Sequence, residues 1–232
     1  MKEILILLIL AIWVHPSFSQ SGTQETGTLM GGNNIFAPAP RPGVTIGSNY
    51  LDAKWNIATI TLFQSNKILE GYPVKYDLKE NRLEVKTLKK IELVETKKIK
   101  TLVWKDSITQ SPKTFVNGSE YTENGAPLTG LLEVLTDGKA RLLKRNSIFV
   151  KNPDFVPELG IGNRDTKIST EVTFYYASGS EVTKIANRKS LLHCFGDESA
   201  DVKKFMKANN LSVNSEHDIT RVFEYYNSNS RR

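Results

Sequence analysis

Short runs in which apolar and polar residues alternate fill the middle of the chain and predict β-strands. In the first run Trp55, Ile57, Thr59, Thr61 and Phe63 share one face of the expected strand. A spacing of about ten residues per strand, with polar turns between, is typical of an antiparallel meander, a roll or a barrel. Parallel winding is not expected, because no stretch here has room for a crossover helix. The further runs lie at about 68–76, 82–87, 90–94, 100–105 and 113–117.

Two apolar runs within residues 131–145 are joined by Asp137-Gly138 and predict a hairpin at the centre of the fold. Glycine tolerates the positive φ of a type I′ turn, so a two-residue turn is expected at this dipeptide. Leucines then lie on both faces of the ribbon, which indicates a strand pair covered on both sides. The expected register pairs Leu135 with Ala140, Val134 with Arg141 and Leu132 with Leu143, and places Glu133 diagonally from Lys144.

After residue 150 the pattern changes twice. Residues 151–170 are rich in Pro, Gly, Asn and Asp and predict a linker, whereas 171–176 and 182–186 predict a second hairpin. From residue 187 apolar residues recur at helical spacing, and about three helices are expected, each too short to be stable alone. The expected N-caps are Asn187, Asp197 or Ser199, and Ser215; the apolar stripes are Leu191, Leu192 and Phe195, then Val202, Phe205 and Met206, then Ile219, Val222, Phe223 and Tyr226.

The first residues predict a secretory signal peptide over 1–19. The unbroken apolar run at 4–14 is too short to span a membrane, and Ser17 and Ser19 occupy the −3 and −1 positions of a cleavage site before Gln20. The alternative is a short buried or anchoring helix. No cysteine follows the expected cleavage site, so a lipid anchor is not expected. The expected location is the periplasm, the cell envelope or the extracellular space.

These patterns together predict an α+β fold, in which a mainly antiparallel β meander or roll is followed by a small C-terminal β-hairpin and about three short helices. The leader before the strands contains few large apolar residues and is expected to be disordered. Alternatively it orders on a partner, with Ile35, Phe36 and Tyr50 as anchors. The expected parts are a signal peptide (1–19), a disordered leader (20–52), an antiparallel β domain (53–150), a linker (151–170), a β-hairpin and helical unit (171–228) and a frayed tail (229–232).

Composition limits the classes of protein further. Of the 232 residues 39% are hydrophobic, which is enough to bury a core. The chain has 31 Lys and Arg residues against 25 Asp and Glu, a formal net charge of +6. This charge permits weak attraction to an acidic surface such as lipid head groups or envelope polysaccharide, while the expected export argues against a nucleic-acid partner. The single cysteine excludes an intrachain disulfide.

Few residues of the expected mature chain offer catalytic or metal-binding chemistry. His193, His217 and Cys194 are too few for a closed zinc site, and no metal, cofactor or catalytic residue is predicted. Cys194 falls near the C-terminus of an expected helix, where the partial negative charge disfavours a thiolate, so a buried structural cysteine is expected. The carboxylates that a fold would have to bring together for acid–base chemistry include Glu133, Asp137 and Glu171.

Two groups of side chains are candidate binding surfaces. Lysines crowd the strands after residue 85 and form either an anion-docking patch or a solvated face that protects an edge strand. Paired tyrosines in the C-terminal part form either a sugar- or peptide-binding face or core packing. The lysines are Lys86, Lys89, Lys90, Lys97, Lys98 and Lys100, and the tyrosines are Tyr175, Tyr176, Tyr225 and Tyr226.

Short segments spread over most of the expected mature chain carry a family resemblance. They are Tyr76-Asp77 before a turn, Leu83-Glu84-Val85 after it, the hairpin at 133–139 followed by Leu142-Leu143-Lys144, then Tyr175-Tyr176 and Tyr225-Tyr226-Asn227. With the expected cleavage before Gln20, this combination resembles a group of uncharacterised exported proteins of the Bacteroidota phylum. The resemblance implies an envelope location and no assigned activity, and it supplies no catalytic residues.

The leading hypothesis is a non-enzymatic exported protein of the cell envelope that acts by binding or as a structural component. Its expected partner is an envelope protein or an acidic envelope polymer. An alternative is a hydrolase of envelope or extracellular polymers, which requires a cleft with two facing Asp or Glu side chains. A further alternative is polyanion docking through the lysines at 86–100, which predicts binding that weakens steeply with salt.

Overall fold

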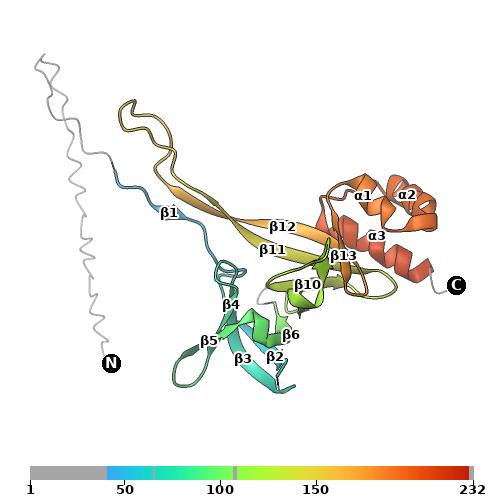
Figure 1. The fold of residues 1–232 in the computed structure, drawn as a ribbon, viewed down its shortest axis with the longest axis horizontal. Coiled ribbons are helices and arrows are strands. Elements are labelled where there is room, and N and C mark those ends of the chain that lie inside the picture. Colours follow the sequence, from blue (N-terminus) through green and yellow to red (C-terminus); the bar gives the residue numbers. More distant parts are fainter. Residues whose placement is uncertain (1–40, 65, 107–108, 230–232) are drawn as a thin grey trace, which may run out of the picture. The chain divides into compact units, whose positions relative to one another are not determined.

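The fold was obtained as a computed structural model that describes residues 41–64, 66–106 and 109–229 (Figure 1). The expected signal peptide, the leader up to residue 40 and the tail from residue 230 lie outside the described residues. The described residues from Pro42 onward form one compact unit. The strands before residues 151–170 and the strands and helices after them are therefore not separate compact units.

The described residues form one sheet of 13 strands, followed along the chain by three α-helices. Neighbouring strands are antiparallel except for β1 with β12 and β8 with β13. A mostly antiparallel sheet with three helices confirms the expected α+β class. The strand order is β5-β4-β3-β2-β6-β7-β10-β11-β12-β13-β8-β9, with β1 beside β12.

The bounds of the elements, in chain order, are as follows. The strands are β1 Thr45–Ile46, β2 Asn56–Leu62, β3 Ile68–Asp77, β4 Arg82–Lys86, β5 Ile91–Glu95, β6 Ile99–Lys105, β7 Pro112–Asn117, β8 Thr122–Glu123, β9 Ala126–Pro127, β10 Leu131–Thr136, β11 Arg141–Lys151, β12 Thr166–Ser178 and β13 Glu181–Ile185. The α-helices are α1 Arg188–His193, α2 Ser199–Ala208 and α3 Glu216–Asn229, and the 3-10 helices are η1 Thr96–Lys98, η2 Gly118–Glu120 and η3 Gly196–Glu198.

The first half of the sheet buries a hydrophobic cluster, here termed the meander cluster. In β2 the buried apolar side chains are those of Ala58 and Ile60, whereas Ile57 is 53% exposed. Ile60 lies opposite Leu102 of β6, and residues paired across strands share a face, so this face of β2 is the one that meets the core. The opposite face, the one expected to carry Trp55, Ile57 and Phe63, is thus the more exposed one. The meander cluster consists of Ala58, Ile60, Val74, Tyr76, Leu78, Leu83, Val85, Ile99, Leu102, Trp104, Phe115 and Leu131.

The central hairpin forms between β10 and β11, but the expected register and turn are wrong. The connection spans residues 137–140 instead of two residues. Asp137 accepts hydrogen bonds from the Arg141 guanidinium and the Gly138 N–H, and Asn227 of α3 bonds both backbone groups of Ala140. These contacts hold Ala140 out of the ladder. The observed pairs are Leu132 with Arg145, Glu133 with Lys144, Val134 with Leu143 and Thr136 with Leu142.

Residues 151–170, expected to be a linker, end one strand and begin the next. β11 and β12 pair without a break from Arg141 opposite Ala177 to Lys151 opposite Lys167. The Pro, Gly and Asn residues that suggested a linker lie in the connection at 152–165, whereas the residues from Lys167 onward join the ladder. β12 also pairs with β13, so the C-terminal strands belong to the same sheet as the central hairpin.

The helices bury a second cluster, here termed the helical cluster, against β10 to β13. The Asn187 side chain accepts the Ser190 N–H at 2.9 Å, and Ser215 Oγ accepts the Asp218 N–H at 3.3 Å, so both expected caps are confirmed. The expected cap of α2 is wrong, because α2 continues directly from η3 and no side chain caps it. The cluster consists of Ala140, Leu142, Phe174, Ile185, Leu191, Phe195, Val202, Met206, Leu211, Ile219, Val222, Phe223 and Tyr226.

The opposite face of the central strands carries a third cluster. Leu142 belongs to the helical cluster and its neighbour Leu143 to the third cluster, as the alternation of a strand requires. The central strands are therefore covered on both faces, as their leucines predicted. The third cluster consists of Tyr121, Leu128, Leu132, Leu143, Tyr175, Ala177 and Val182.

Candidate functional site: the arm formed by β11 and β12

Strands β11 and β12 continue past their neighbours as a two-stranded ribbon, here termed the arm and defined as residues 146–173 (Figure 1). β10 pairs with β11 only as far as Arg145, and β13 pairs with β12 only from Phe174 onward. β1 covers Thr166 and Lys167. Residues 146–151 and 168–173 therefore have an outer edge without a strand partner among the described residues. At such an edge alternate residues present backbone N–H and C=O groups for pairing.

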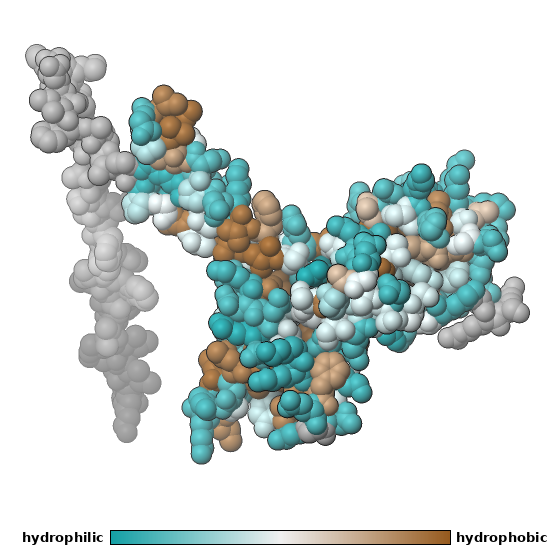
Figure 2. Space-filling model, viewed as in Figure 1, coloured by the Kyte–Doolittle hydropathy of each residue, from teal (hydrophilic) through white to brown (hydrophobic). Residues whose placement is uncertain are grey.

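Exposed apolar side chains gather on the arm, and Figure 2 shows them at its tip. Leu159 is 68% exposed, Ile161 59% and Phe149 50%. Val150 and Val172 are also exposed. Val150 lies opposite Ile168 and Val172 opposite Asn146. Paired residues share a face and every second residue of a strand does too, so Val150 and Val172 lie on the same face of the ribbon. Apolar side chains gathered on one exposed element are typical of an interaction site.

The tip of the arm is held by its own hydrogen bonds. The Asp154 N–H donates to the carbonyl of Asn163 and the Val156 N–H to the carbonyl of Ile161, both at 2.9 Å. The Asn163 N–H in turn donates to Asp154 Oδ1 at 2.6 Å. This bond lowers the pKa of Asp154, and the charge of Lys151 adds to the effect. The tip therefore presents its apolar side chains on a defined turn.

The outer edge of β12 already holds one added strand, β1. The Thr166 N–H donates to the carbonyl of Val44 at 3.0 Å, and the Val44 N–H donates to Asp165 Oδ1 at 3.1 Å. A Cβ at Gly47 would lie 2.1 Å from the carbonyl oxygen of Ile168, so glycine is required for this close approach. β1 runs parallel to β12. The edge of the arm thus accepts an extended segment that is distant in sequence.

A cavity lies beside each open edge. One of about 710 Å³ lies along β12 where β13 ends, and its charged lining residues are Glu171, Lys184 and Glu216. Another of about 290 Å³ lies between β11 and the turn that joins β3 to β4, and its charged lining residues are Lys79 and Arg145. An extended chain paired with either edge would place side chains in the adjacent cavity.

The six lysines expected as one anion-docking patch are all exposed, but they lie in two groups beyond opposite ends of β5. A strand of five residues spans roughly 17 Å, so the two groups are separate surfaces. Lys90 pairs with Glu92 at 3.0 Å, and Lys97 pairs with Glu95 at 2.5 Å. The first group is Lys86, Lys89 and Lys90 at the turn between β4 and β5; the second is Lys97 and Lys98 in η1 with Lys100 in β6.

The four tyrosines considered as a binding face do not form one surface. Tyr175 and Tyr176 are neighbours on β12 and point to opposite faces of the sheet, Tyr175 into the third cluster and Tyr176 against the helical cluster. Tyr226 is buried in the helical cluster. Tyr225 stacks on Phe205 of α2, with ring centroids 4.0 Å apart and planes 4° from parallel. These rings serve core and helix packing, which was the alternative interpretation.

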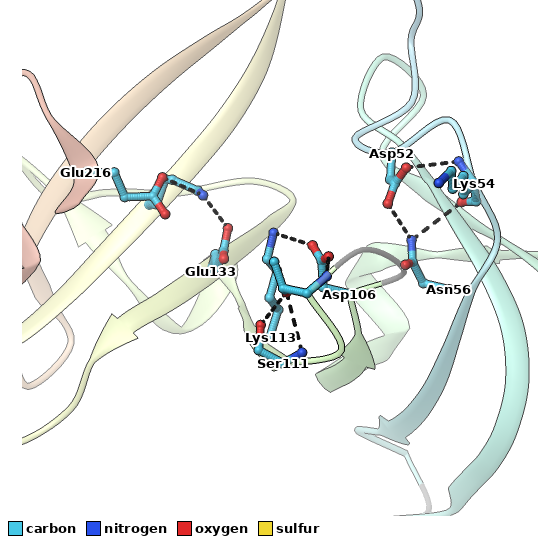
Figure 3. A network of polar contacts seen from close by, with 10 residues as sticks. Asp52, Lys54, Asn56, Asp106, Ser111, Lys113, Glu133 and Glu216 are labelled. Carbon is cyan, nitrogen blue, oxygen red and sulfur yellow. Dashed lines mark hydrogen bonds and ion pairs between the residues drawn. The ribbon is translucent and has the colours of Figure 1, made fainter.

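A row of charged residues crosses one face of the sheet between the meander cluster and the helical cluster (Figure 3). Lys144 Nζ lies 2.6 Å from Glu133 Oε2 and 2.9 Å from Glu216 Oε2, and Lys113 pairs with Asp106 at 2.9 Å. Burial alone would lower the pKa of Lys113, but the hydrogen bond to Asp106 and the charges of Glu133 and Glu216 raise it overall. Since Glu133 and Glu216 share one ammonium group, they form an ion cluster.

The few groups with nucleophilic or ligand chemistry are not brought together. Cys194 Sγ donates to the carbonyl of Ser190 at 3.2 Å, and burial raises the pKa of this thiol to about 11. His193 and His217 are exposed. Within the ranges that the structure describes, no group of three or more His, Cys, Asp or Glu side chains is arranged to hold a metal ion.

The arm was not predicted from the sequence as a candidate site. Its open edges depend on where β10 and β13 stop pairing, which no local pattern gives. One usable signal existed, since Val156, Leu159 and Ile161 are large apolar residues in a segment otherwise rich in Pro, Gly, Asn and Asp. In a turn that packs on no core, such residues are available for an external contact.

In the part of the chain that the structure describes, no helix has the length and apolar character needed to cross a membrane. Comparison with known proteins gave no match, whether to a family model, to a curated protein or to a solved structure. The functional argument therefore rests on the geometry of the arm.

Proposed function

We propose that the protein is an exported, non-enzymatic binding component of the cell envelope that docks through its arm on an extended segment of a partner protein. The observation that carries this proposal is the coincidence, on one ribbon, of two open strand edges and several exposed apolar side chains. Strand addition supplies backbone hydrogen bonds, and the apolar side chains supply buried surface. The pairing of β1 with β12 supports it, because this edge already takes one extended segment.

Export is supported by the apolar run at 4–14 and by Ser17 and Ser19 before Gln20, together with the resemblance to exported Bacteroidota proteins. Cell fractionation with N-terminal sequencing tests this part of the proposal. The expected result is an envelope or extracellular protein that begins at Gln20. An uncleaved chain in the cytoplasm would contradict it.

Docking through the arm is tested by affinity capture from the native envelope fraction at low and high salt. The arm variant is Leu159→Ser with Ile161→Ser, and the matched control is Ile57→Ser with Ile91→Ser, which removes exposed apolar side chains elsewhere. Burial of a Leu or Ile side chain contributes roughly 1.5–3 kcal/mol, so loss of both weakens an apolar contact by more than about a hundredfold. We expect wild type and control to retain a defined protein at high salt and the arm variant to lose it.

Amide hydrogen exchange on the captured complex locates the contact. Strand addition should slow exchange in residues 146–151 or 168–173, since amides at an open edge then gain a partner. A complex that protects neither edge, or an arm variant that retains the same partner, would overturn the proposal.

A second candidate is docking on an acidic envelope polymer through the turn between β4 and β5. Leu88 is fully exposed there between lysines, and Lys86 and Lys89 form no ion pair with any described residue. Such binding should weaken steeply with salt and with Lys86→Gln and Lys89→Gln, whereas arm docking should not. The carboxylate hydrolase has weaker support. Glu171 and Glu216 both line the 710 Å³ cavity, but Glu216 is bound to Lys144.

A further inference from the structure

We infer that the 290 Å³ cavity beside β11 is a carboxylate-binding pocket, which holds one Asp or Glu side chain of the extended chain docked on that edge. This inference rests on the proposed function and specifies the chemistry of the partner. It follows from the charges of the lining, from one amide without a partner and from the strand edge that forms one wall.

The charged lining of the cavity is entirely basic. Lys79 and Arg145 line it, and no Asp or Glu does. Neither cation forms an ion pair with a described residue. Arg145 Nη2 donates to Thr129 Oγ1 at 3.0 Å, and the guanidinium also interacts with the Tyr175 hydroxyl. These contacts orient the guanidinium and leave further N–H donors. Glu80, which follows Lys79 in the chain, lines the neighbouring cavity of about 360 Å³. The pocket therefore favours an anion.

A neutral donor adds to these cations. The Leu131 N–H donates to Tyr76 Oη at 3.0 Å, so the tyrosine hydroxyl hydrogen is directed to Asn81 Oδ1 at 3.1 Å. This chain of bonds fixes the orientation of the Asn81 amide. Its NH2 group has no partner among the described residues, and Asn81 lines the cavity. The cavity therefore holds two cations and an amide NH2, all of which are hydrogen-bond donors, but no anionic acceptor. A carboxylate would supply that acceptor.

The wall formed by β11 shows why the anion belongs to an extended chain. Residues 146–148 and Val150 line the cavity, and their outer backbone edge is the open one. A strand paired there places every second side chain on the same face, so one of them enters the cavity. The edge continues to Lys151 beyond the cavity, which means that the docked strand runs past it. The carboxylate is therefore that of a side chain within the strand.

The test is selection of a displayed library of random 12-residue peptides against the purified protein, followed by affinity measurements on the enriched peptides. We expect an Asp or Glu at a fixed position within an alternating apolar pattern. Changing that residue to its amide should weaken binding at least roughly tenfold, as should Arg145→Gln in the protein. Lys79→Gln should also weaken it. Lys167→Gln, on the opposite strand of the arm and outside the cavity, is the matched control and should change binding less than about twofold.

The outcomes separate this inference from the proposed function. Peptides that protect residues 146–151 from hydrogen exchange but need no acidic residue, or that bind the Lys79→Gln and Arg145→Gln variants unchanged, overturn the inference and leave arm docking in place. Failure of every peptide to protect either edge of the arm overturns both. Lys79 is exposed, so Lys79→Gln should not disturb folding. This variant therefore still tests the pocket if Arg145→Gln does not fold.

Discussion

Lys144 and Glu133 lie directly opposite each other on β11 and β10, with Nζ 2.6 Å from Oε2. Both side chains are more than nine-tenths buried, and they lie between the meander cluster and the helical cluster. Removal of one member of a buried ion pair destabilises a protein more than removal of both, because the remaining charge stays buried without its partner. The pair is therefore compatible with burial between the two clusters only when both side chains are present.

Replacement of one member of this pair should destabilise the protein more than replacement of both. Lys144→Met should lower the free energy of unfolding by about 3 kcal/mol, and adding Glu133→Leu should restore most of the loss. Urea denaturation measures both. Lys204→Met, which removes an exposed pair with Asp201 at 3.2 Å, is the control and should cost less than about 1 kcal/mol. A double variant as unstable as the single one would contradict this account.

Asn227 should be needed for the conformation of the loop between β10 and β11. Its Oδ1 accepts the Ala140 N–H and its Nδ2 donates to the Ala140 carbonyl, both at 2.8 Å. Asn227→Ala should cost about 1–3 kcal/mol, and Asn227→Asp should also destabilise because an acceptor then faces the carbonyl. Thermal unfolding measures the effect. Ser228→Ala, the exposed neighbour, is the control, and an equal loss there would argue against a specific role.

Cys194 should react slowly with thiol reagents while the protein is folded. Its pKa of about 11 leaves little thiolate at pH 8, and its hydrogen is engaged by Ser190. The rate of iodoacetamide labelling at pH 8 should be at least about tenfold slower in the native protein than in urea. The native rate should rise as the pH approaches 11. Equal rates in the two states would contradict the burial of this thiol.

The tip of the arm should loosen in acid. The carboxylate of Asp154 has a lowered pKa because it accepts the Asn163 N–H, so its contribution is complete above the ordinary value of 3.8 and is lost as pH falls through the lowered value. The amide resonance of Asn163 should therefore titrate with a midpoint below 3.8. Asp154→Asn should abolish this titration. A midpoint at or above 3.8 in the wild type would contradict the observed geometry.

Local sequence patterns predicted an element well where an apolar stripe or a capping side chain within a few residues determines it. The stripe of α3 and the caps at Asn187 and Ser215 follow from helical spacing and side-chain chemistry within a few residues. The strands of the central hairpin were also found, but their register was not. The observed register has an irregularity between Val134 and Thr136, and Ala140 lies outside the ladder, bonded to Asn227 far along the chain. No local pattern indicates either feature.

The candidate site was beyond the reach of the sequence for a similar reason. Lys79 and Arg145 are ordinary charged residues in their own segments. Four strands separate β3 from β11 in the sheet, and only the tertiary fold brings the turn after β3 beside β11. The tyrosine and lysine candidates were chosen by proximity in the chain. Alternation sends Tyr175 and Tyr176 to opposite faces, and the length of β5 separates the lysines.

The unbroken pairing of β11 with β12 gives the arm a mechanical character. The same ladder that includes Val150 and Ile168 in the arm includes Leu142 and Tyr176 beneath the helices. Because this ladder is unbroken, backbone hydrogen bonds link the arm directly to the two strands that carry these side chains. If the arm holds a partner as proposed, the contact is therefore continuous with the packing of the helices, as it would not be at the end of a flexible tether.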